Sequence, residues 1–319
     1  MSGHDQVSSP FGRASEFVAR LGSSDRAQRA VTASPAAREV ARRFIAAENT
    51  GEAVETVRQN HTKGLRSTLE PLLAPARGVD DVRAAVGAHR ELVQEVSRAG
   101  LASVAEVTVK PSTIGLGLSD ARLAQAALGE ICLAARNAGS LVSLDLEEPS
   151  TTDETYALFS LCHQDFPQLG VTVQSRQRRS LVDSRWLASM PARVRLCKGG
   201  YSQPWATGHI TGQDVDQSFI ACLEVLMAGR GHPMVATHDP QLVEATIQIA
   251  GQHQRAGDSY EFQMYHGVRP WEHRRLVDTG HQVRVHLPVG SDWYAYLLRR
   301  VTERPANVMP LLRALVTRR

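Results

Sequence analysis

The chain has 319 residues, of which 42% are hydrophobic and 22% are charged, and this balance excludes a disordered chain outside the termini. Lysine and arginine together exceed aspartate and glutamate by only three and are spread along the sequence, so nucleic acid is not an expected partner. The four cysteines lie 25 to 35 residues apart without a C-x-x-C pair, which predicts neither a zinc site nor a disulfide framework.

The beginning of the chain predicts helices, because residues 1–63 show apolar positions with a period near 3.6 and Gly64 is suited to end that pattern. The first residues contain no apolar signal-peptide core, and no run approaches the roughly 18 apolar residues of a membrane-spanning helix. We therefore expect a cytoplasmic protein, with peripheral contact to the inner face of the membrane as an open alternative. The expected organisation is an N-terminal helical segment, 1–63, and one larger domain, 64–319.

After residue 64, short β-branched runs alternate with helical patterns. A weak first run, LRSTLEPLL, is followed by seven clearer ones: AEVTVKPS, LVSLDLEE, GVTVQS, RVRLCKGGY, PMVATHDP, YEFQMYHG and QVRVHLPVG. Eight successive β–α units are typical of an α/β protein with a parallel (β/α)8 TIM-type barrel. A doubly wound open sheet alternates in the same way, but no G-x-G-x-x-G follows the first strand, so the dinucleotide-binding version is disfavoured.

Polar residues recur at or near the ends of these strands. In a parallel barrel the chemistry lies at the C-terminal ends of the strands, because the loops there converge on one mouth. Any one such residue is more often a satisfied strand end, but together they predict a site. The candidates are Lys110, Asp145, Gln174, Arg195, Lys198, Thr237, His238, Gln263 and His286.

The last predicted helix carries a polar face. Ser291 is suited to cap its N-terminus. Residues three and four apart share a helix face, and this spacing brings together Tyr296, Arg299, Arg300 and Glu303. The face is either a solvated surface with a weak arginine–glutamate pair or a carboxylate clamp, since two adjacent guanidinium groups offer bidentate recognition that lysine lacks.

From about residue 38 to 310, the chain resembles the proline dehydrogenase family in seven motifs that keep their order and spacing. The motifs are VKPSTIG, LDLEEPS, VQSRQRRS, RLCKGGY, ATHDP, EFQMYHG and RVHLPVGSDWYAYLLRRVTERPAN. The resemblance implies a distorted (β/α)8 barrel that binds FAD, with the last helix over the barrel mouth. It also implies oxidation of L-proline to 1-pyrroline-5-carboxylate by hydride transfer to flavin N5, with the electrons passed to a quinone-type acceptor.

The resemblance assigns substrate roles. Arg299 and Arg300 match the arginine pair that binds the substrate carboxylate, and Lys110 matches a lysine that assists them. Asp145 matches an acidic residue near the substrate amine. The tyrosines that wall the pocket match Tyr201 and Tyr296.

The resemblance also assigns cofactor roles. Arg195 matches the arginine that hydrogen-bonds near flavin N5, where a positive group favours the anionic reduced flavin, and Glu303 matches the glutamate that buttresses the final motif. The other FAD contacts match Gln174, Lys198, Thr237, His238 and Gln263.

Three positions of the expected substrate pocket depart from the family. His286 stands where a tyrosine usually packs on the substrate and discourages extra hydroxyls, and Tyr265 stands where a leucine is usual. A family L-G-E motif, whose glutamate pairs with the first arginine of the clamp, ends here in Ala74. These changes make the pocket more polar and leave Arg299 without its usual partner.

Several functions therefore remain open. L-proline is the first expected substrate, and a substituted or hydroxylated proline, or another secondary amino acid, is the alternative. A non-catalytic binding module is a different alternative, because the gating glutamate is missing. Another flavin barrel, such as a methylenetetrahydrofolate reductase, shares the fold but lacks the R-R-x-x-E helix.

Overall fold

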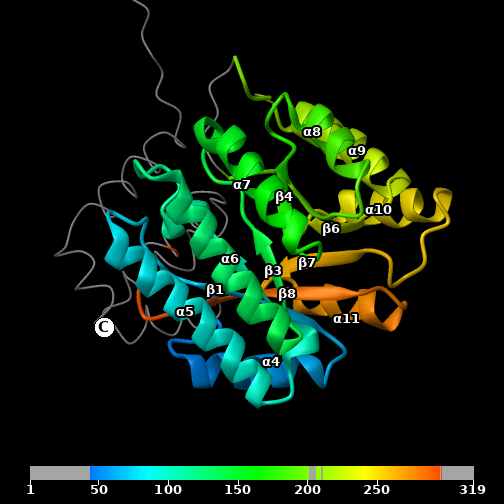
Figure 1. The fold of residues 1–319 in the computed structure, drawn as a ribbon. Coiled ribbons are helices and arrows are strands. Elements are labelled where there is room, and N and C mark those ends of the chain that lie inside the picture. The colour runs from blue at the N-terminus through cyan, green and yellow to red at the C-terminus, as the bar shows by residue number, and fades with distance from the viewer. Residues whose placement is uncertain (1–43, 201–205, 210, 295, 297–319) are drawn as a thin grey trace, which may run out of the picture.

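Eight short parallel strands close into one barrel in chain order, which confirms the predicted (β/α)8 TIM-type architecture (Figure 1). The structure is a computed structural model and describes residues 44–200, 206–209, 211–294 and 296. Strand β8 pairs with β1 over six residues and so closes the barrel. The strands are β1 (Arg66–Pro71), β2 (Ala105–Val109), β3 (Leu141–Leu144), β4 (Gly170–Gln174), β5 (Arg193–Cys197), β6 (His232–Ala236), β7 (Glu261–Tyr265) and β8 (Val283–Val289).

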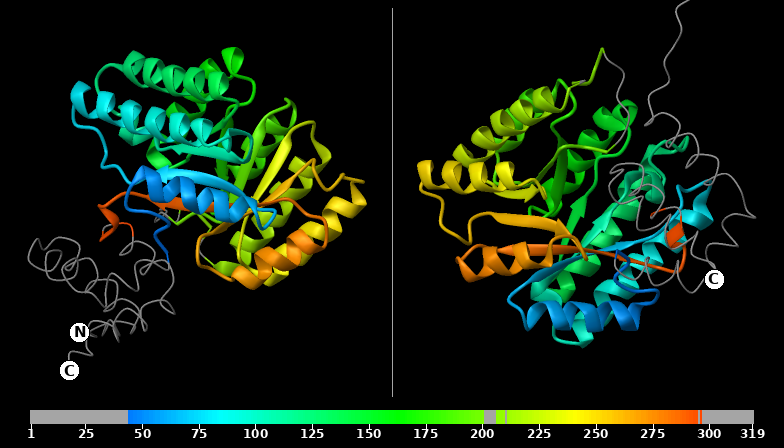
Figure 2. Two further views of the ribbon diagram at one scale, coloured as in Figure 1. Left: turned by 90° about the horizontal axis from the view of Figure 1, so that it is seen from below. Right: turned by 180° about the vertical axis from the view of Figure 1, so that it is seen from behind.

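A helix follows each strand from β1 to β7, and these helices surround the barrel (Figure 2). They are α5 (Val79–Arg98), α6 (Ala121–Ala138), α7 (Thr152–Asp165), α8 (Ser180–Ala188), α9 (Gly212–Ala228), α10 (Pro240–Gln252) and α11 (Pro270–Asp278). Side-chain oxygens that accept from backbone N–H groups cap several helix starts, as expected for these residue types. Among these capping residues are Asp120, Thr211 and Asp239.

The strand positions that face the helices are apolar and buried. Val107 and Val109 of β2 and Leu196 of β5 join Phe159 of α7 and Phe219 of α9 in one hydrophobic core. Burying each side chain of this size contributes about 1.5 to 3 kcal/mol. This layer therefore holds the helices against the barrel and leaves the other face of each strand for the interior.

The first described residues, from residue 44 on, pack against the barrel. Ala47 forms a parallel bridge with Val289 of β8, and helix α4 (Thr50–His61) follows. Ala53 and Val57 of α4 belong to the same hydrophobic core as the barrel. The division of the chain at residue 63 stays a prediction, and residues 1–43 lie outside the part described.

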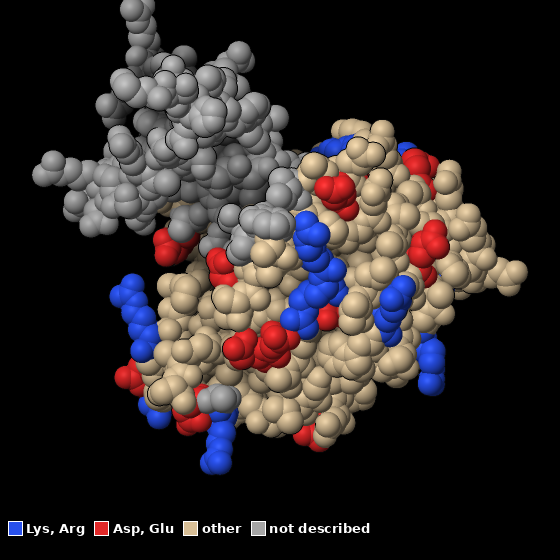
Figure 3. All heavy atoms as spheres, turned by 90° about the horizontal axis from the view of Figure 1, so that it is seen from above, with Lys and Arg blue, Asp and Glu red and all other residues tan. Residues whose placement is uncertain are grey.

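One face of the described surface carries both signs of charge. On the face drawn in Figure 3, acidic and basic side chains alternate instead of forming one patch of a single sign. No helix within the described ranges has both the length and the apolar character needed to cross a bilayer.

Candidate active site at the carboxyl end of the barrel

The interior of the barrel is filled by charged side chains. Arg193 and Arg195 of β5 both contact Glu106 of β2, and Arg284 of β8 donates two hydrogen bonds to Glu261 of β7, at 2.7 and 3.0 Å. Strands β2 and β5 are not neighbours, so the contacts of Glu106 cross the interior. Burial acts to raise the pKa of Glu106, but Arg193, Arg284 and Arg195 lower it to about 2. The glutamate is therefore ionised at neutral pH.

Arg195 is the centre of the candidate site. Its Nη1 donates to Asp145 Oδ1 at 2.5 Å and to Thr108 Oγ1 at 3.0 Å, and its Nε donates to Gln263 Oε1 at 2.6 Å. Its Nη2 donates to Glu106 Oε1 at 2.9 Å and to the Ser143 hydroxyl at 2.7 Å. A guanidinium has five N–H donors, so each donor of Arg195 has an acceptor from the barrel.

Arg195 stays positively charged in its buried position. Burial acts to lower its pKa, but Asp145 and Glu106 raise the pKa above its ordinary value. The site thus contains a fixed cation that bridges β2, β3, β5 and β7.

Asp145 is held through one of its two carboxylate oxygens. It directly follows β3, and its backbone N donates to Val109 O at 2.9 Å. Besides Arg195, the hydroxyls of Thr108 and Thr172 donate to Oδ1, at 3.1 and 3.4 Å. No hydrogen bond from another described residue reaches Oδ2. The side chain is 21% exposed, so Oδ2 can meet a ligand at the mouth.

Glu70 lies at the same mouth and is not among the residues predicted from the sequence. This residue of β1 forms an ion pair with Lys110, directly after β2, and its Oε2 lies 2.5 Å from Nε2 of His286 in β8. Burial acts to raise the pKa of Glu70, but Lys110 and His286 hold it well below its ordinary value. The mouth therefore contains a second buried carboxylate close to Lys110.

Three rings from neighbouring strands form one edge of the mouth. His238 stacks on Tyr265 with 5.4 Å between ring centroids and 10° between planes, and Tyr265 meets His286 edge-on at 5.4 Å and 84°. The backbone N of Tyr265 donates to Nε2 of His238 at 2.8 Å, so a neutral His238 carries its proton on Nδ1. Thr237, next to it, accepts through Oγ1 from the backbone N of Asp239 at 3.1 Å.

Gln174, at the end of β4, allows a test of whether the site fits a flavin. Its Nε2 donates to the carbonyls of Leu146 and Glu147 at 2.5 and 3.2 Å. Its Oε1 is buried without a hydrogen-bond partner among the residues described, which costs about 1 to 3 kcal/mol. Gly199 has φ 89°, and a Cβ there would lie 2.9 Å from this oxygen. An isoalloxazine ring carries an N–H that can satisfy such an acceptor, so the residues present fit the expected cofactor.

Lys198 is fixed between two carboxylates near Gln174. Its Nζ lies 3.0 Å from Asp239 Oδ2 and 2.5 Å from Asp216 Oδ1, and the side chain is 34% exposed. Asp239 also caps α10 through its other oxygen, which accepts from the backbone N of Gln241 at 3.0 Å. The lysine ammonium is therefore held between α9 and the start of α10.

The structure places most of the predicted site residues at this end of the barrel. They are Lys110, Asp145, Gln174, Arg195, Lys198, Thr237, His238, Gln263, Tyr265 and His286. Ala74 lies in the loop between β1 and α5 and is exposed, and Tyr296 is buried. The other predicted residues, Tyr201, Arg299, Arg300 and Glu303, lie outside the part described, so the arginine clamp stays a prediction.

Several charged residues on the inner faces of the strands were not predicted from the sequence. The prediction used the polar residues at or near strand ends, whereas the missed residues follow from the alternation along each strand, which also turns Arg195 inward. The signal was present, since charged or polar letters recur at every second position in STLEP, AEVTV, RVRLC and RVH. The missed residues are Glu70, Glu106, Arg193, Glu261 and Arg284.

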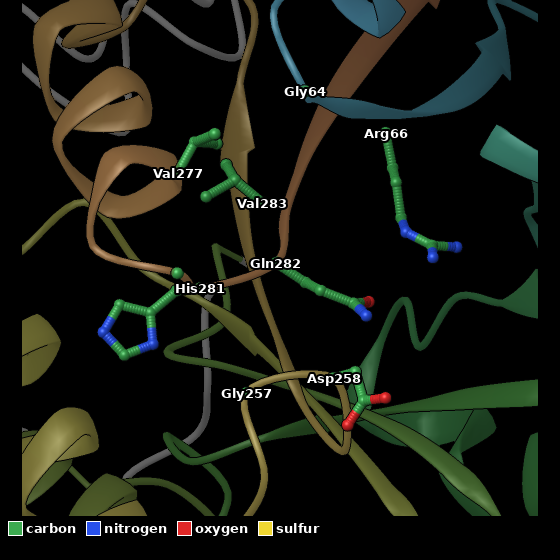
Figure 4. A pocket seen from close by; sticks show the side chains of 9 residues that line it. Gly64, Arg66, Gly257, Asp258, Val277, His281, Gln282 and Val283 are labelled. Carbon is green, nitrogen blue, oxygen red and sulfur yellow. The ribbon is translucent and has the colours of Figure 1, made fainter.

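A separate pocket lies at the opposite end of the barrel (Figure 4). Its lining includes Arg66, the first residue of β1, and two residues that precede strands, Asp258 before β7 and Gln282 before β8. Its lining contains none of the predicted site residues. This pocket is therefore separate from the candidate site at the carboxyl end.

Comparison with known proteins gives one consistent family. A family model described as proline dehydrogenase matches residues 53–311. The chain is 30% identical over 276 residues to proline dehydrogenase 1 of Bacillus subtilis (strain 168), covering 86% of this chain and 90% of that protein. It is 29% identical over 280 residues to a proline dehydrogenase of Deinococcus radiodurans, covering 84% and 87%.

The fold is similar to solved structures of larger proteins. The crystal structure of proline utilization A (PutA) from Bdellovibrio bacteriovorus, inactivated by N-propargylglycine, matches with a TM-score of 0.76 and 21% identity. The match covers 83% of this chain and 32% of that one, so this chain spans about a third of the solved protein. At this identity the likeness concerns the barrel fold.

Proposed function

The chain belongs to the proline dehydrogenase family, and on this premise we propose that it is an FAD-dependent oxidoreductase acting on CH–NH donors. The proposed reaction is the oxidation of L-proline to 1-pyrroline-5-carboxylate in proline catabolism. The observation that carries the proposal is the Arg195–Asp145 pair, bonded at 2.5 Å, at a barrel mouth where Lys110 also lies. A fixed cation beside a carboxylate suits a substrate that must lose a hydride next to its amine.

The residues at the mouth fit the cofactor that this reaction needs. FAD, when bound, supplies the ring that accepts the hydride at N5. Gln174 would hold that ring through its buried Oε1, and the charge of Arg195 near N5 would favour the anionic reduced form. Since every N–H of Arg195 already has an acceptor, a hydrogen bond to the flavin requires the exchange of one of them. Further contacts would come from Lys198, Thr237, His238 and Gln263.

Side chains of the mouth would also orient the substrate. Lys110 would bind the substrate carboxylate together with Arg299 and Arg300 of the helix predicted from the sequence, which Glu303 would hold in place. Asp145 would receive a hydrogen bond from the substrate amine at Oδ2, and help it lose its proton before the neighbouring carbon gives up a hydride. Holding the substrate in one orientation lowers the barrier by several kcal/mol. The pocket walls would be Tyr201, Tyr265, His286 and Tyr296.

A substituted or hydroxylated proline, or another secondary amino acid, is the second candidate substrate. The edge-on contact of Tyr265 and His286 favours it, because these rings place polar groups at the mouth where the family usually has leucine and tyrosine. A non-catalytic binding module is the third candidate function. The Arg195–Asp145 pair and the Lys110–Glu70 pair at the same mouth support catalysis instead.

The test is an anaerobic titration of the purified protein. We expect a yellow protein with a flavin spectrum that L-proline bleaches and that a soluble quinone analogue restores. Bleaching by another cyclic amino acid alone would select the second candidate. A colourless protein that takes up no added FAD would contradict the proposal and support the binding module.

We also propose a quinone as the electron acceptor, reached by a cytoplasmic enzyme at the inner face of the membrane. Reduced protein should sediment with lipid vesicles that contain a quinone and should be reoxidised by them. If reoxidation is equally fast with quinone-free vesicles in the absence of oxygen, this acceptor is wrong.

A further inference from the structure

Glu106 occupies a distinctive position beneath the candidate site. It lies on β2, is fully buried, and faces two arginines of the opposite strand β5, with Oε2 contacting Arg193 and Oε1 accepting from Arg195. Its Oε1 also accepts from the hydroxyls of Ser143 at 2.6 Å and Thr68 at 3.2 Å. Glu106 thus holds Nη2 of Arg195, whereas Asp145 holds Nη1.

Glu106 is one of several carboxylates that compensate the interior arginines. Arg193, Arg195 and Arg284 lie with Glu106 and Glu261, and Arg195 also pairs with Asp145 at the mouth. Opposite charges in a water-poor interior interact more strongly than in solvent. The share of positive charge that Arg195 presents at the mouth therefore depends on how much of it Glu106 compensates.

We propose that Glu106 is a positioning residue that fixes Arg195 and sets how much of its positive charge reaches the flavin, and thereby sets the reduction potential of the flavin. The inference rests on the proposed function, because it needs FAD at the mouth. A carboxylate beneath Arg195 disfavours the added electrons, whereas the loss of its charge stabilises the anionic reduced ring. Arg193 acts in the opposite sense, since it shares Glu106 with Arg195 and draws part of its negative charge away.

The two residues therefore predict shifts of opposite sign. In Glu106→Gln, we expect the two-electron reduction equilibrium of the bound flavin to move at least tenfold toward the reduced form, which is about 30 mV upward. In Arg193→Met, which leaves Glu106 to Arg195 alone, we expect a shift of roughly threefold or more toward the oxidised form. Potentials are measured by anaerobic titration against redox dyes, together with FAD content and unfolding temperature.

A matched control separates this role from a general loss of buried ion pairs. Glu272 of α11 is also buried and pairs with Arg275, but it lies on the outside of the barrel. Glu272→Gln should leave the potential within twofold of the wild-type equilibrium. Glu106→Asp, which keeps the charge, should lie closer to wild type than Glu106→Gln.

The measurements have definite outcomes. The inference is supported if the flavin potential shifts in opposite directions in the two variants. It also requires that the shift caused by Glu106→Gln falls below twofold when Arg195→Met is present as well. Shifts of equal sign, a potential equal to that of Glu272→Gln, or an undiminished shift without Arg195 would overturn it. If Glu106→Gln does not fold, the sign of the Arg193→Met shift decides. If proline bleaches the wild-type protein but the variants keep the wild-type potential, only this inference is wrong. If the wild-type protein binds no FAD, both the proposed function and this inference are wrong.

Discussion

The two faces of the barrel strands have opposite chemistry although both are buried. On β5, Leu196 faces the helices within an apolar core, while its neighbour Arg195 faces inward and bonds to two carboxylates. Apolar burial stabilises without demanding one geometry, whereas a buried ion pair often contributes little net stability compared with a well-packed apolar pair. We conclude that the apolar outer face provides most of the stability of the barrel. The charges of the inner face instead hold Arg195 and its neighbours in one geometry.

The strongest test of this comparison breaks one interior pair. Arg284→Met leaves Glu261 buried and without its bidentate partner, so we expect a loss of about 3 to 5 kcal/mol in the free energy of unfolding. Replacing both partners, as Glu261→Leu with Arg284→Met, should be less damaging than the single change. Urea unfolding followed by circular dichroism measures both. A double variant less stable than the single one would show that the interior charges are themselves a main source of stability.

Lowering the pH should reduce the free energy of unfolding through the charged interior and not through the apolar outer face. Glu70, Glu106 and Glu261 have folded-state pKa values below the ordinary 4.5, about 2 for Glu106, because their cationic partners outweigh the effect of burial. Their stabilising contribution is complete above pH 4.5 and is lost as the pH falls toward the folded values, by about 1.4 kcal/mol per pH unit for each carboxylate. Urea unfolding at pH 3 to 6 measures this slope. A free energy of unfolding that stays constant between pH 4.5 and 3 would contradict the lowered values.

Adjacent residues of β5 allow the two faces to be compared directly. Leu196→Ala should lower the free energy of unfolding by about 2 to 5 kcal/mol while the folded protein keeps its flavin and its kcat. Arg195→Met should also destabilise the protein, because it removes a partner of Glu106 and Asp145, but it should in addition lower the kcat of the folded variant by about 100-fold. Thermal unfolding and steady-state assays of both variants make the comparison. Equal losses of kcat in the two folded variants would remove the functional distinction between the faces.

The same distinction explains what the sequence could and could not reveal. The barrel was predictable because alternating strand and helix patterns are local, and even the weak run LRSTLEPLL contains β1. Strand-end residues such as Asp145 were predictable because all strands of a parallel barrel end at one mouth. Their pairings were not predictable, since Glu70 meets a partner 216 residues away in His286. Such contacts depend on the register and closure of the whole barrel.

Ala74 shows that assigning roles to single residues from a family resemblance can mislead. The resemblance indicated a missing glutamate at this place, and the residue is indeed an exposed alanine in the loop after β1. The structure nevertheless places a carboxylate beside Lys110, because Glu70 points inward from the strand itself. A lost motif residue therefore does not mean that the mouth lacks negative charge.

The smallest expected effect concerns the edge of the mouth. His286 contacts Tyr265 edge-on and lies 2.5 Å from Glu70, so its ring is held where it can meet the substrate. His286→Tyr should shift preference toward unsubstituted proline by about tenfold, because a typical hydrogen bond contributes a net of roughly 0.5 to 1.5 kcal/mol. The ratio of kcat/KM for L-proline to that for 4-hydroxyproline measures it, with Leu196→Ala as a control whose side chain faces the helices. An unchanged ratio would mean that His286 belongs to the charged interior through Glu70 and takes no part in choosing the substrate.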